Sequence, residues 1–155
     1  MMIALPEHER RPRQFLARAT VAVELAPPGV KSVLDLWCGH CDLLRVLPGG
    51  VQYLGLDKKP LKPRVVTVDL SNGLPSDFEG QYTVSFALGL FEYLADPLPL
   101  LSTLRSHARS LVCSVNTRYI GPESLAASLT QGGWFIVRRH KGHRTMFFVA
   151  VPEVT

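Results

Sequence analysis

The 155-residue chain lacks the features that mark several classes of protein. It has no run of about 18 apolar residues, the length that a helix needs to cross a bilayer. The N-terminal stretch MMIALPEHERRPR reaches Pro6 and several charges before a signal-peptide core can form. Three cysteines cannot form a complete disulfide framework, because an odd number leaves one thiol unpaired. We therefore expect a cytoplasmic protein that does not enter a membrane.

Charged residues are also scarce, and the two signs are close to balance. They make up 19% of the chain against 46% hydrophobic residues, a composition that excludes disorder and coiled coil. It predicts a single domain over residues 1–155, with an N-terminal helical segment at 1–30 and a core at 31–155. The net charge of +4 allows an anionic partner such as nucleic acid but does not favour one.

Seven short apolar runs, bounded by glycine, proline and aspartate, predict seven β-strands. Several of them are apolar on successive residues, as in parallel strands that helices cover on both faces. The strands are expected at residues 33–37, 51–56, 65–68, 82–88, 111–115, 134–138 and 145–151. Helical spacing lies between them at residues 14–25, 97–108 and 123–130, with a short helical segment at 42–47. Alternating strands and helices predict a doubly wound α/β sheet.

Two connections modify this outline. Residues 57–64 (DKKPLKPR) contain two prolines, which argues against a regular crossover helix between the second and third strands. The last two runs are separated by RHKGHR, a spacing that favours an antiparallel hairpin. We therefore predict a mostly parallel seven-stranded sheet whose last strand is antiparallel.

The first predicted strand runs into a tight loop within SVLDLWCGHC, residues 32–41. Ligands of open α/β sheets bind at the carboxyl ends of the strands, so a cofactor is expected here. The second strand ends at Asp57, 18 residues after Gly39 and near the spacing at which an acid accepts both ribose hydroxyls. A dinucleotide needs three glycines at its pyrophosphate, but Trp37, Gly39 and Cys41 stand at those positions, which disfavours NAD and FAD.

A nucleoside that carries an amino-acid tail in place of phosphate makes weaker demands on such a loop. Asp35, backbone amides and a helix N-terminus can hold the tail. S-adenosylmethionine fits this description.

These residues resemble the motifs of the class I S-adenosylmethionine-dependent methyltransferases. Residues 33–41 resemble the family's first motif, Asp-Leu-Gly-Cys-Gly-x-Gly, and residues 55–57 resemble its Gly-x-Asp motif. VTVDLSNGLP resembles the third motif, whose acid and apolar residue lie beside the adenine, and YTVSFALGLFEYLADP resembles the fourth. The resemblance implies a Rossmann-like methyltransferase fold that binds S-adenosylmethionine. It implies that the cofactor-binding residues are Asp35, Trp37, Gly39, Asp57, Lys58, Asp69, Leu70 and Ala87.

The first loop departs from the family motif, because Trp37 and Cys41 replace its first and last glycines. Cys41 adds a side chain where the cofactor tail approaches, so a non-catalytic scaffold or binding protein of the same fold remains an alternative. WCGHC is also the active-site pentapeptide of protein disulfide isomerases, in which a helix N-terminus lowers the pKa of the first thiol. A thiol-disulfide oxidoreductase that uses Cys38 and Cys41 is the second alternative, although Pro48 ends the following helix early.

Methyl transfer is an in-line displacement at a sulfonium methyl, so the protein mainly aligns the reactants and excludes water. If the acceptor is a hydroxyl, a general base after the fourth strand helps, and Glu92 is our candidate. The sequence lacks the Asn/Asp-Pro-Pro-aromatic and Pro-Cys motifs of enzymes that methylate base nitrogens and cytosine C5. A small-molecule or sugar-type acceptor is therefore expected. No metal site is predicted, and the oligomeric state is left open.

Overall fold

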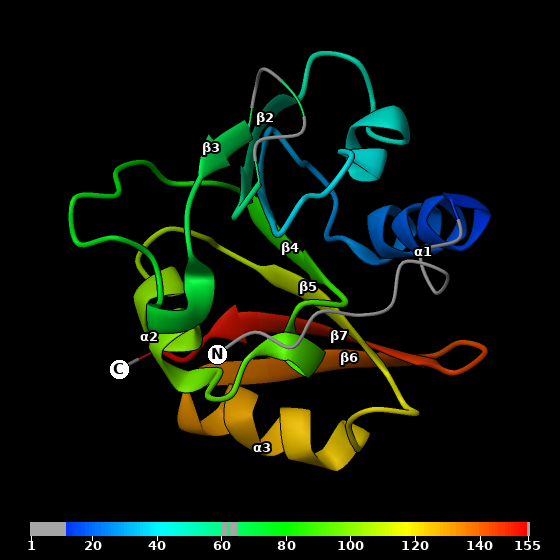
Figure 1. Cartoon of the computed structure of the whole chain (residues 1–155), viewed down its shortest axis with the longest axis vertical. Helices are drawn as coiled ribbons and strands as arrows, with labels where there is room; N and C mark the ends of the chain where they lie inside the picture. The colour runs from blue at the N-terminus through cyan, green and yellow to red at the C-terminus, as the bar shows by residue number, and fades with distance from the viewer. Residues whose placement is uncertain (1–11, 60–61, 63–64, 155) are drawn as a thin grey trace.

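The computed structural model describes residues 12–59, 62 and 65–154, and these residues form one seven-stranded sheet (Figure 1). The strand order is β3-β2-β1-β4-β5-β7-β6, and β7 runs antiparallel to both of its neighbours. The remaining pairs are parallel, which confirms the predicted doubly wound sheet with an antiparallel last strand. The strands are β1 Ser32–Leu36, β2 Gln52–Asp57, β3 Val65–Thr67, β4 Val84–Leu88, β5 Leu111–Asn116, β6 Trp134–Lys141 and β7 Thr145–Pro152.

The hairpin of β6 and β7 turns at residues 142–144, where the Gly142 N–H donates to the Thr145 carbonyl at 2.8 Å. So short a connection cannot cross over to a parallel strand, which is why β7 is antiparallel. The sequence predicted an end for the sixth strand at residue 138, but the strand continues to Lys141. Its last residues are polar, and pairing with β7 rather than burial keeps them extended.

Helices cover both faces of the sheet (Figure 1). On one face lies α1, Pro12–Leu25, and on the other lie α2, Leu98–Leu104, and α3, Pro122–Gln131. None of the helices in the described part of the chain is long and apolar enough to cross a membrane.

The second helix is shorter than predicted, since it ends at Leu104 and not at residue 108. The reason is a strand-like contact that begins just after it. Ala108 forms an isolated parallel bridge with Tyr82, and the Tyr82 N–H donates to the His107 carbonyl at 2.8 Å. Pairing with Tyr82, two residues before β4, therefore replaces the last helical turn.

The connections at the carboxyl ends of the strands are short and contain 3-10 turns in place of α-helices. These turns are η2 Asp42–Arg45, η3 Leu70–Asn72 and η4 Phe91–Tyr93. The segment between β2 and β3 forms no helix in the residues described there, 58, 59 and 62. Because η2 covers little of the sheet, α1 packs on η2, β4 and β5 and completes that face.

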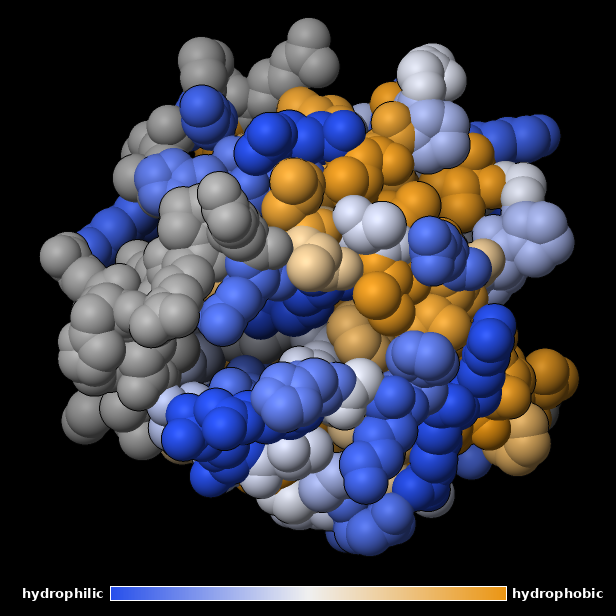
Figure 2. Space-filling view, turned by 90° about the vertical axis from the view of Figure 1, so that its right-hand side faces the viewer, coloured by the Kyte–Doolittle hydropathy of each residue, from blue (hydrophilic) through white to orange (hydrophobic). Residues whose placement is uncertain are grey.

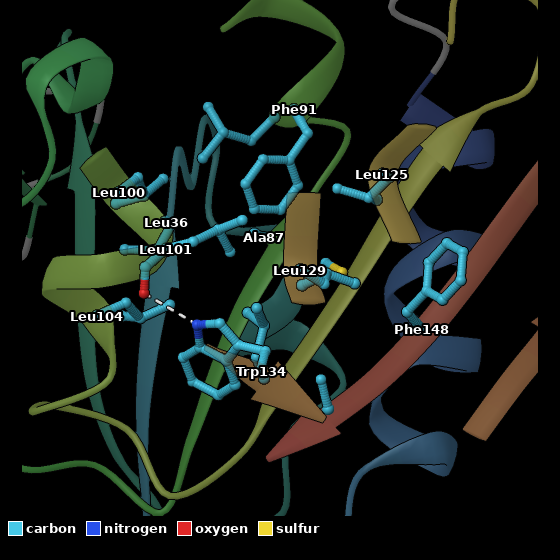
Figure 3. Packing of buried hydrophobic residues seen from close by; sticks show 14 of the residues in the cluster. Leu36, Ala87, Phe91, Leu100, Leu101, Leu104, Leu125, Leu129, Trp134 and Phe148 are labelled. Atoms are coloured by element: carbon cyan, nitrogen blue, oxygen red, sulfur yellow. Dashed lines mark hydrogen bonds between the residues drawn. The ribbon is translucent and has the colours of Figure 1, made fainter. Parts of the chain in front are cut away.

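Two apolar clusters flank the sheet. The cluster on the α2 and α3 side contains Trp134, whose indole N–H donates to the Leu101 carbonyl of α2 at 2.9 Å (Figure 3). Its other labelled members are Leu36, Ala87, Phe91, Leu100, Leu104, Leu125, Leu129 and Phe148. The cluster on the α1 side packs Ala19, Ala22 and Leu25 against Val33, Val84, Phe86, Val112, Phe147 and Val149. The sheet is thus buried from both sides, and polar groups gather at its carboxyl edge.

Candidate functional site

The loop after β1 is held against the end of β2 by a single carboxylate. The Gly39 N–H donates to Asp57 Oδ2 at 2.8 Å, and the Lys59 N–H donates to Asp57 Oδ1 at 3.0 Å. Asp57 is only 5% exposed. Because β1 and β2 are neighbouring parallel strands, their carboxyl ends meet at the same edge of the sheet. The structure therefore brings together two of the predicted site residues, Gly39 and Asp57.

The same loop has a backbone conformation that normally requires glycine. Trp37 and Cys41 both have φ of 60°, and Gly39 has φ of 54°. A residue with a Cβ pays roughly 1–2 kcal/mol in this left-handed region. An ideal Cβ on Gly39 would meet no atom of the described residues within 4 Å, so these residues leave the space over the middle of the loop open. The loop keeps the backbone of a glycine-rich turn although two of its glycines are replaced.

The side chains of these replacements pack onto the protein. The Trp37 ring lies 4.8 Å from the Tyr93 ring, centroid to centroid, and contacts the cluster on the α2 and α3 side. Cys41 is buried with Cys38 and Val65, and a Cβ added to Gly55 would lie only 2.8 Å from the Cys38 sulfur, too close for an unstrained contact. The glycine of the predicted Gly-x-Asp motif therefore makes room for Cys38.

The thiols do not have the environment of a redox pair. Cys38, Cys41 and Cys113 are free and buried. Burial is the main cause that raises the pKa of Cys38, and the nearby Asp35 carboxylate raises it further. A thiol oxidoreductase needs the opposite, a lowered pKa and an accessible sulfur. Cys38 and Cys41 act as small apolar side chains.

Asp35 lies on the α1 side of the sheet, at the carboxyl end of β1. It is buried, and its Oδ2 accepts a hydrogen bond from the Tyr53 hydroxyl at 2.6 Å. Burial raises the pKa of Asp35 to about 7, while the Tyr53 hydrogen bond and the Arg18 charge act in the other direction. The Asp57 charge contributes to the rise, so the two predicted carboxylates lie in each other's field.

Glu92, the predicted base, lies on η4 just after β4. Its Oε1 atom is buried and accepts no hydrogen bond from the described part of the chain. Burial is the main cause that raises the pKa of Glu92 to about 7, against the lowering effects of the Asn116 backbone and the Arg18 charge. A carboxyl group of this kind can take up a proton near neutral pH.

Arg18 is a site residue that the sequence analysis missed. It extends from α1 to the end of β4, where its guanidinium lies against Gly89. Its charge interacts chiefly with Glu92 and Asp35. Positions 18, 22 and 25 share one face of the helix, and Ala22 and Leu25 are buried. A charge on an otherwise apolar stripe was the signal that could have identified it, whereas nothing local marks Tyr53 as the partner of Asp35.

The remaining predicted residues lie to one side of this group. Lys58 Nζ is 3.9 Å from Asp69 Oδ2, and the Asp69 side chain is 51% exposed. Asp69 Oδ1 accepts hydrogen bonds from the Ser71 N–H and hydroxyl, and these lower the pKa of Asp69. Leu70 and Ala87 are buried in the cluster on the α2 and α3 side. Lys58 and Asp69 thus come together at the ends of β2 and β3, while Leu70 and Ala87 lie beneath the surface.

Figure 2 shows the side of the molecule toward which β4 and β5 run, and its surface is hollowed near the middle, where hydrophilic groups are exposed. At this carboxyl edge the structure has an open space over Gly39, a strand-end carboxylate at Asp57, and two buried polar atoms, Glu92 Oε1 and Arg18 Nε, that form no hydrogen bond within the described part of the chain. These features fit a nucleoside ligand with a charged tail. They suit S-adenosylmethionine, whose amino-acid end carries both charges.

No protein-family model matches this sequence, and neither does any curated protein. Solved structures do match its fold. One is a chain of the complex between the Haloferax volcanii Trm112 methyltransferase activator and the putative methyltransferase, with TM-score 0.72, 16% identity and 92% of both chains covered. Another is the Burkholderia thailandensis 1,6-didemethyltoxoflavin-N1-methyltransferase with bound S-adenosylhomocysteine, with TM-score 0.72, 15% identity, and 95% of this chain and 84% of that chain covered.

A third match is the [4+2]-cyclase SpnF, with TM-score 0.67, 14% identity, and 92% of this chain and 81% of that chain covered. Identities this low establish the fold alone. The chain has the Rossmann-like α/β fold of the class I methyltransferases, and a cyclase with the same fold shows that the fold does not dictate the reaction.

Proposed function

We propose that this chain is an S-adenosylmethionine-dependent methyltransferase that acts on a small-molecule or sugar-type acceptor. The observation that carries the proposal is the 2.8 Å hydrogen bond from the Gly39 N–H to Asp57 Oδ2. Each carboxylate oxygen has two lone pairs, so Asp57 can hold the loop and still accept the two ribose hydroxyls. The open space over Gly39 leaves the nucleoside room to approach.

Other residues of the edge complete the cofactor site in this proposal. Lys58 and Asp69 lie at the adenine end, and Asp35 lies where it can accept a hydrogen bond from the ammonium group of the tail. When bound, the cofactor supplies an activated methyl group on a sulfonium. The chain's own part is to hold the two reactants in line and to exclude water from them.

The acceptor side of the proposal rests on Glu92. Its Oε1 atom has no hydrogen-bond partner in the described residues and its pKa is about 7, so it can take the proton of an acceptor hydroxyl as the methyl group is transferred. A small acceptor agrees with the Burkholderia structure, which holds 1,6-didemethyltoxoflavin.

One observation favours a second candidate, a non-catalytic scaffold or binding protein. Trp37 and Cys41 hold the cofactor loop in a strained conformation, and the Cys41 side chain is an addition to a loop that the family keeps as glycine. The packing around these two side chains holds the strained backbone in place, so the loop conformation does not itself require a bound cofactor. The two candidates differ in whether a bound cofactor gives up its methyl group.

Calorimetric titration with S-adenosylhomocysteine tests cofactor binding. We expect micromolar binding to the wild-type protein and at least about tenfold weaker binding to Asp57→Ala, because hydrogen bonds to a charged group contribute about 1.5–3 kcal/mol each. Asp77→Ala is the matched control, since Asp77 is an exposed carboxylate in a turn that the proposal does not assign to the cofactor site. Absence of binding to the wild-type protein would contradict the proposal.

A second measurement separates the enzyme from the scaffold. Radiolabelled S-adenosylmethionine is incubated with the protein and a panel of sugars and phenols, and label in each acceptor is counted. The enzyme transfers label to at least one acceptor, and Glu92→Gln lowers this rate by about 10²–10⁴-fold if Glu92 is the base. Binding of the cofactor without any transfer favours the scaffold.

A further inference from the structure

We infer that a pocket at the amino edge of the sheet binds a small phosphate ester. The pocket adjoins the residues just before β4 and β5 and the last residue of the antiparallel strand β7. In Figure 1 the end of β7 and the tip of its hairpin lie on opposite sides of the molecule. The pocket is therefore separate from the carboxyl edge, and this inference does not rest on the proposed function.

The size of the pocket limits the ligand. Its volume is about 180 Å³. Pockets for drug-sized ligands measure about 300–1,000 Å³, whereas a cavity of about 150 Å³ can hold a benzene molecule. A phosphate group that carries a small apolar part is therefore of the size that fits.

The polar side chains that line the pocket are hydrogen-bond donors. They are the guanidinium groups of Arg105 and Arg109, the hydroxyl of Ser106 and the amide of Gln81, and none of the described residues that line the pocket is acidic. The side chains of Gln81, Ser106 and Arg109 form no hydrogen bond or ion pair with the described part of the chain. An anion with several acceptor oxygens matches such a set of donors.

Arg105 is held in place by the backbone around it. Its Nη2 atom donates to the Glu153 carbonyl at 3.1 Å. A Cβ on Gly133 would come within 2.8 Å of Arg105 Nε and Nη1, so glycine at this position leaves room for the guanidinium. The Nε atom is buried and has no hydrogen-bond partner among the described residues. A guanidinium that is desolvated in this way is costly without a counter-charge, which a bound anion would supply.

The rest of the lining favours a phosphate ester over other anions. Arg105 and Arg109 bring two positive charges, and a phosphate monoester carries about −1.5 to −2 at neutral pH. The remaining lining residues, Tyr82, Ala108 and Pro152, offer mainly apolar surface. This surface can contact the organic part of an ester, which inorganic phosphate lacks.

The charge distribution along the chain acts in the same direction. Residues 97–152 contain seven lysines and arginines but a single acid, Glu123. Arg139 Nη1 lies 2.7 Å from Glu123 Oε1, so this acid already has a partner. The part of the chain that contributes most of the pocket is therefore strongly basic, and its field attracts anions.

NMR titrations of the full chain test the class of ligand. The probes are phenyl phosphate, inorganic phosphate and phenol, which separate the contributions of the charge and the ring. We expect phenyl phosphate to bind in the millimolar range, at least about fivefold more tightly than inorganic phosphate, and phenol to bind more weakly than either. Absence of saturable phenyl phosphate binding would overturn the inference, and so would equal affinity for the two phosphates.

Substitutions test the location. Arg109→Gln and Arg105→Gln should each weaken phenyl phosphate binding by about 3- to 10-fold, because each removes a charged donor from a partly exposed pocket. Arg118→Gln is the matched control, since Arg118 is an exposed arginine on the loop after β5, at the other edge of the sheet. Weakening by Arg118→Gln as large as that by Arg109→Gln would indicate general charge attraction and overturn the inference.

A competition experiment separates this pocket from the proposed cofactor site. Saturating S-adenosylhomocysteine should leave the affinity for phenyl phosphate unchanged, whereas displacement of the probe would place it at the carboxyl edge and overturn the inference. A wild-type protein that binds phenyl phosphate but not S-adenosylhomocysteine would contradict the proposed function alone. Thermal unfolding checks each variant, and Arg109→Gln decides the question if Arg105→Gln does not fold.

Discussion

At the level of single residues, Cys41 and Trp37 show how replacing glycine in a loop affects stability. Both side chains are accommodated by packing, but their backbones stay at a φ of 60°. The side chain and the backbone thus act in opposite directions on stability, and substitutions can separate them.

We expect Cys41→Gly to be more stable than Cys41→Ala by about 1–2 kcal/mol, because both remove the thiol but only glycine relieves the left-handed strain. Urea denaturation measures the difference. Cys113 is the matched control, a buried thiol on β5 whose φ is not positive. There glycine should be less stable than alanine by about 0.5–1 kcal/mol. If alanine were at least as stable as glycine at position 41, the strain would be absent.

Asp35 predicts a pH dependence of stability. In the folded state its pKa is raised from 3.8 to about 7. Between these values the unfolded chain releases the proton while the folded chain retains it, so the free energy of unfolding falls as pH rises, and the contribution is lost above about pH 7. Asp35→Asn keeps an acceptor for the Tyr53 hydroxyl and removes the titration.

The free energy of unfolding of the wild type, minus that of Asp35→Asn, should therefore fall from pH 4 to pH 7, with a slope of up to about 1.4 kcal/mol per pH unit. Urea denaturation across this range measures it. The pKa of Glu92 is raised in the same direction, but Glu92 is present in both proteins and its effect largely cancels. Parallel stability curves would show that Asp35 is not buried as a neutral acid.

At the level of elements, β6 depends on a contact that crosses from the edge of the sheet to α2. Trp134 is fully buried at the start of β6, and its indole N–H donates to the Leu101 carbonyl at 2.9 Å. Trp134→Phe would remove this hydrogen bond, leave a buried carbonyl without its donor and create a cavity. We expect a loss of about 2–4 kcal/mol in the free energy of unfolding, measured in urea.

Phe135→Leu is the control on the same strand, since Phe135 is 59% exposed. It should change stability by no more than about 0.5 kcal/mol. Similar losses in both variants would contradict the view that the α2 contact anchors β6.

The elements also show why some boundaries were predicted and others were not. The short spacing of the last two strands is a local signal, and it correctly predicted the antiparallel hairpin. The prolines at 60 and 63, on which the other prediction depends, lie outside the described residues. The predicted last turn of the helix at 97–108 was wrong, because residues 105–107 form a non-helical turn and Ala108 bridges to Tyr82. A contact between distant segments replaced a local preference.

For the whole molecule, the carboxyl edge of the sheet concentrates both the departures and the chemistry. The turn η2 covers little of the sheet, and α1 covers the face that a longer crossover helix would otherwise cover. The same packing carries Arg18 to the edge, beside Asp35 and Glu92. The helix that covers this face of the sheet thereby also brings a charged group to the site. The chain resembles solved methyltransferases in its fold, and the residues at this edge are the ones on which the proposed nucleoside site depends.

The sequence by itself determined the seven strands, the alternation of strands and helices along the chain, the hairpin and the position of the loop after β1. These features depend on hydrophobic spacing and turn residues, which act over a few neighbours. Only the tertiary structure decided that Tyr53 bonds to Asp35, that Arg18 lies against Gly89, and that Glu92 Oε1 is buried with no hydrogen-bond partner among the described residues. A pKa and an unpaired charge depend on burial and on groups that are distant in the chain. Those quantities exist only once the fold has brought the segments together.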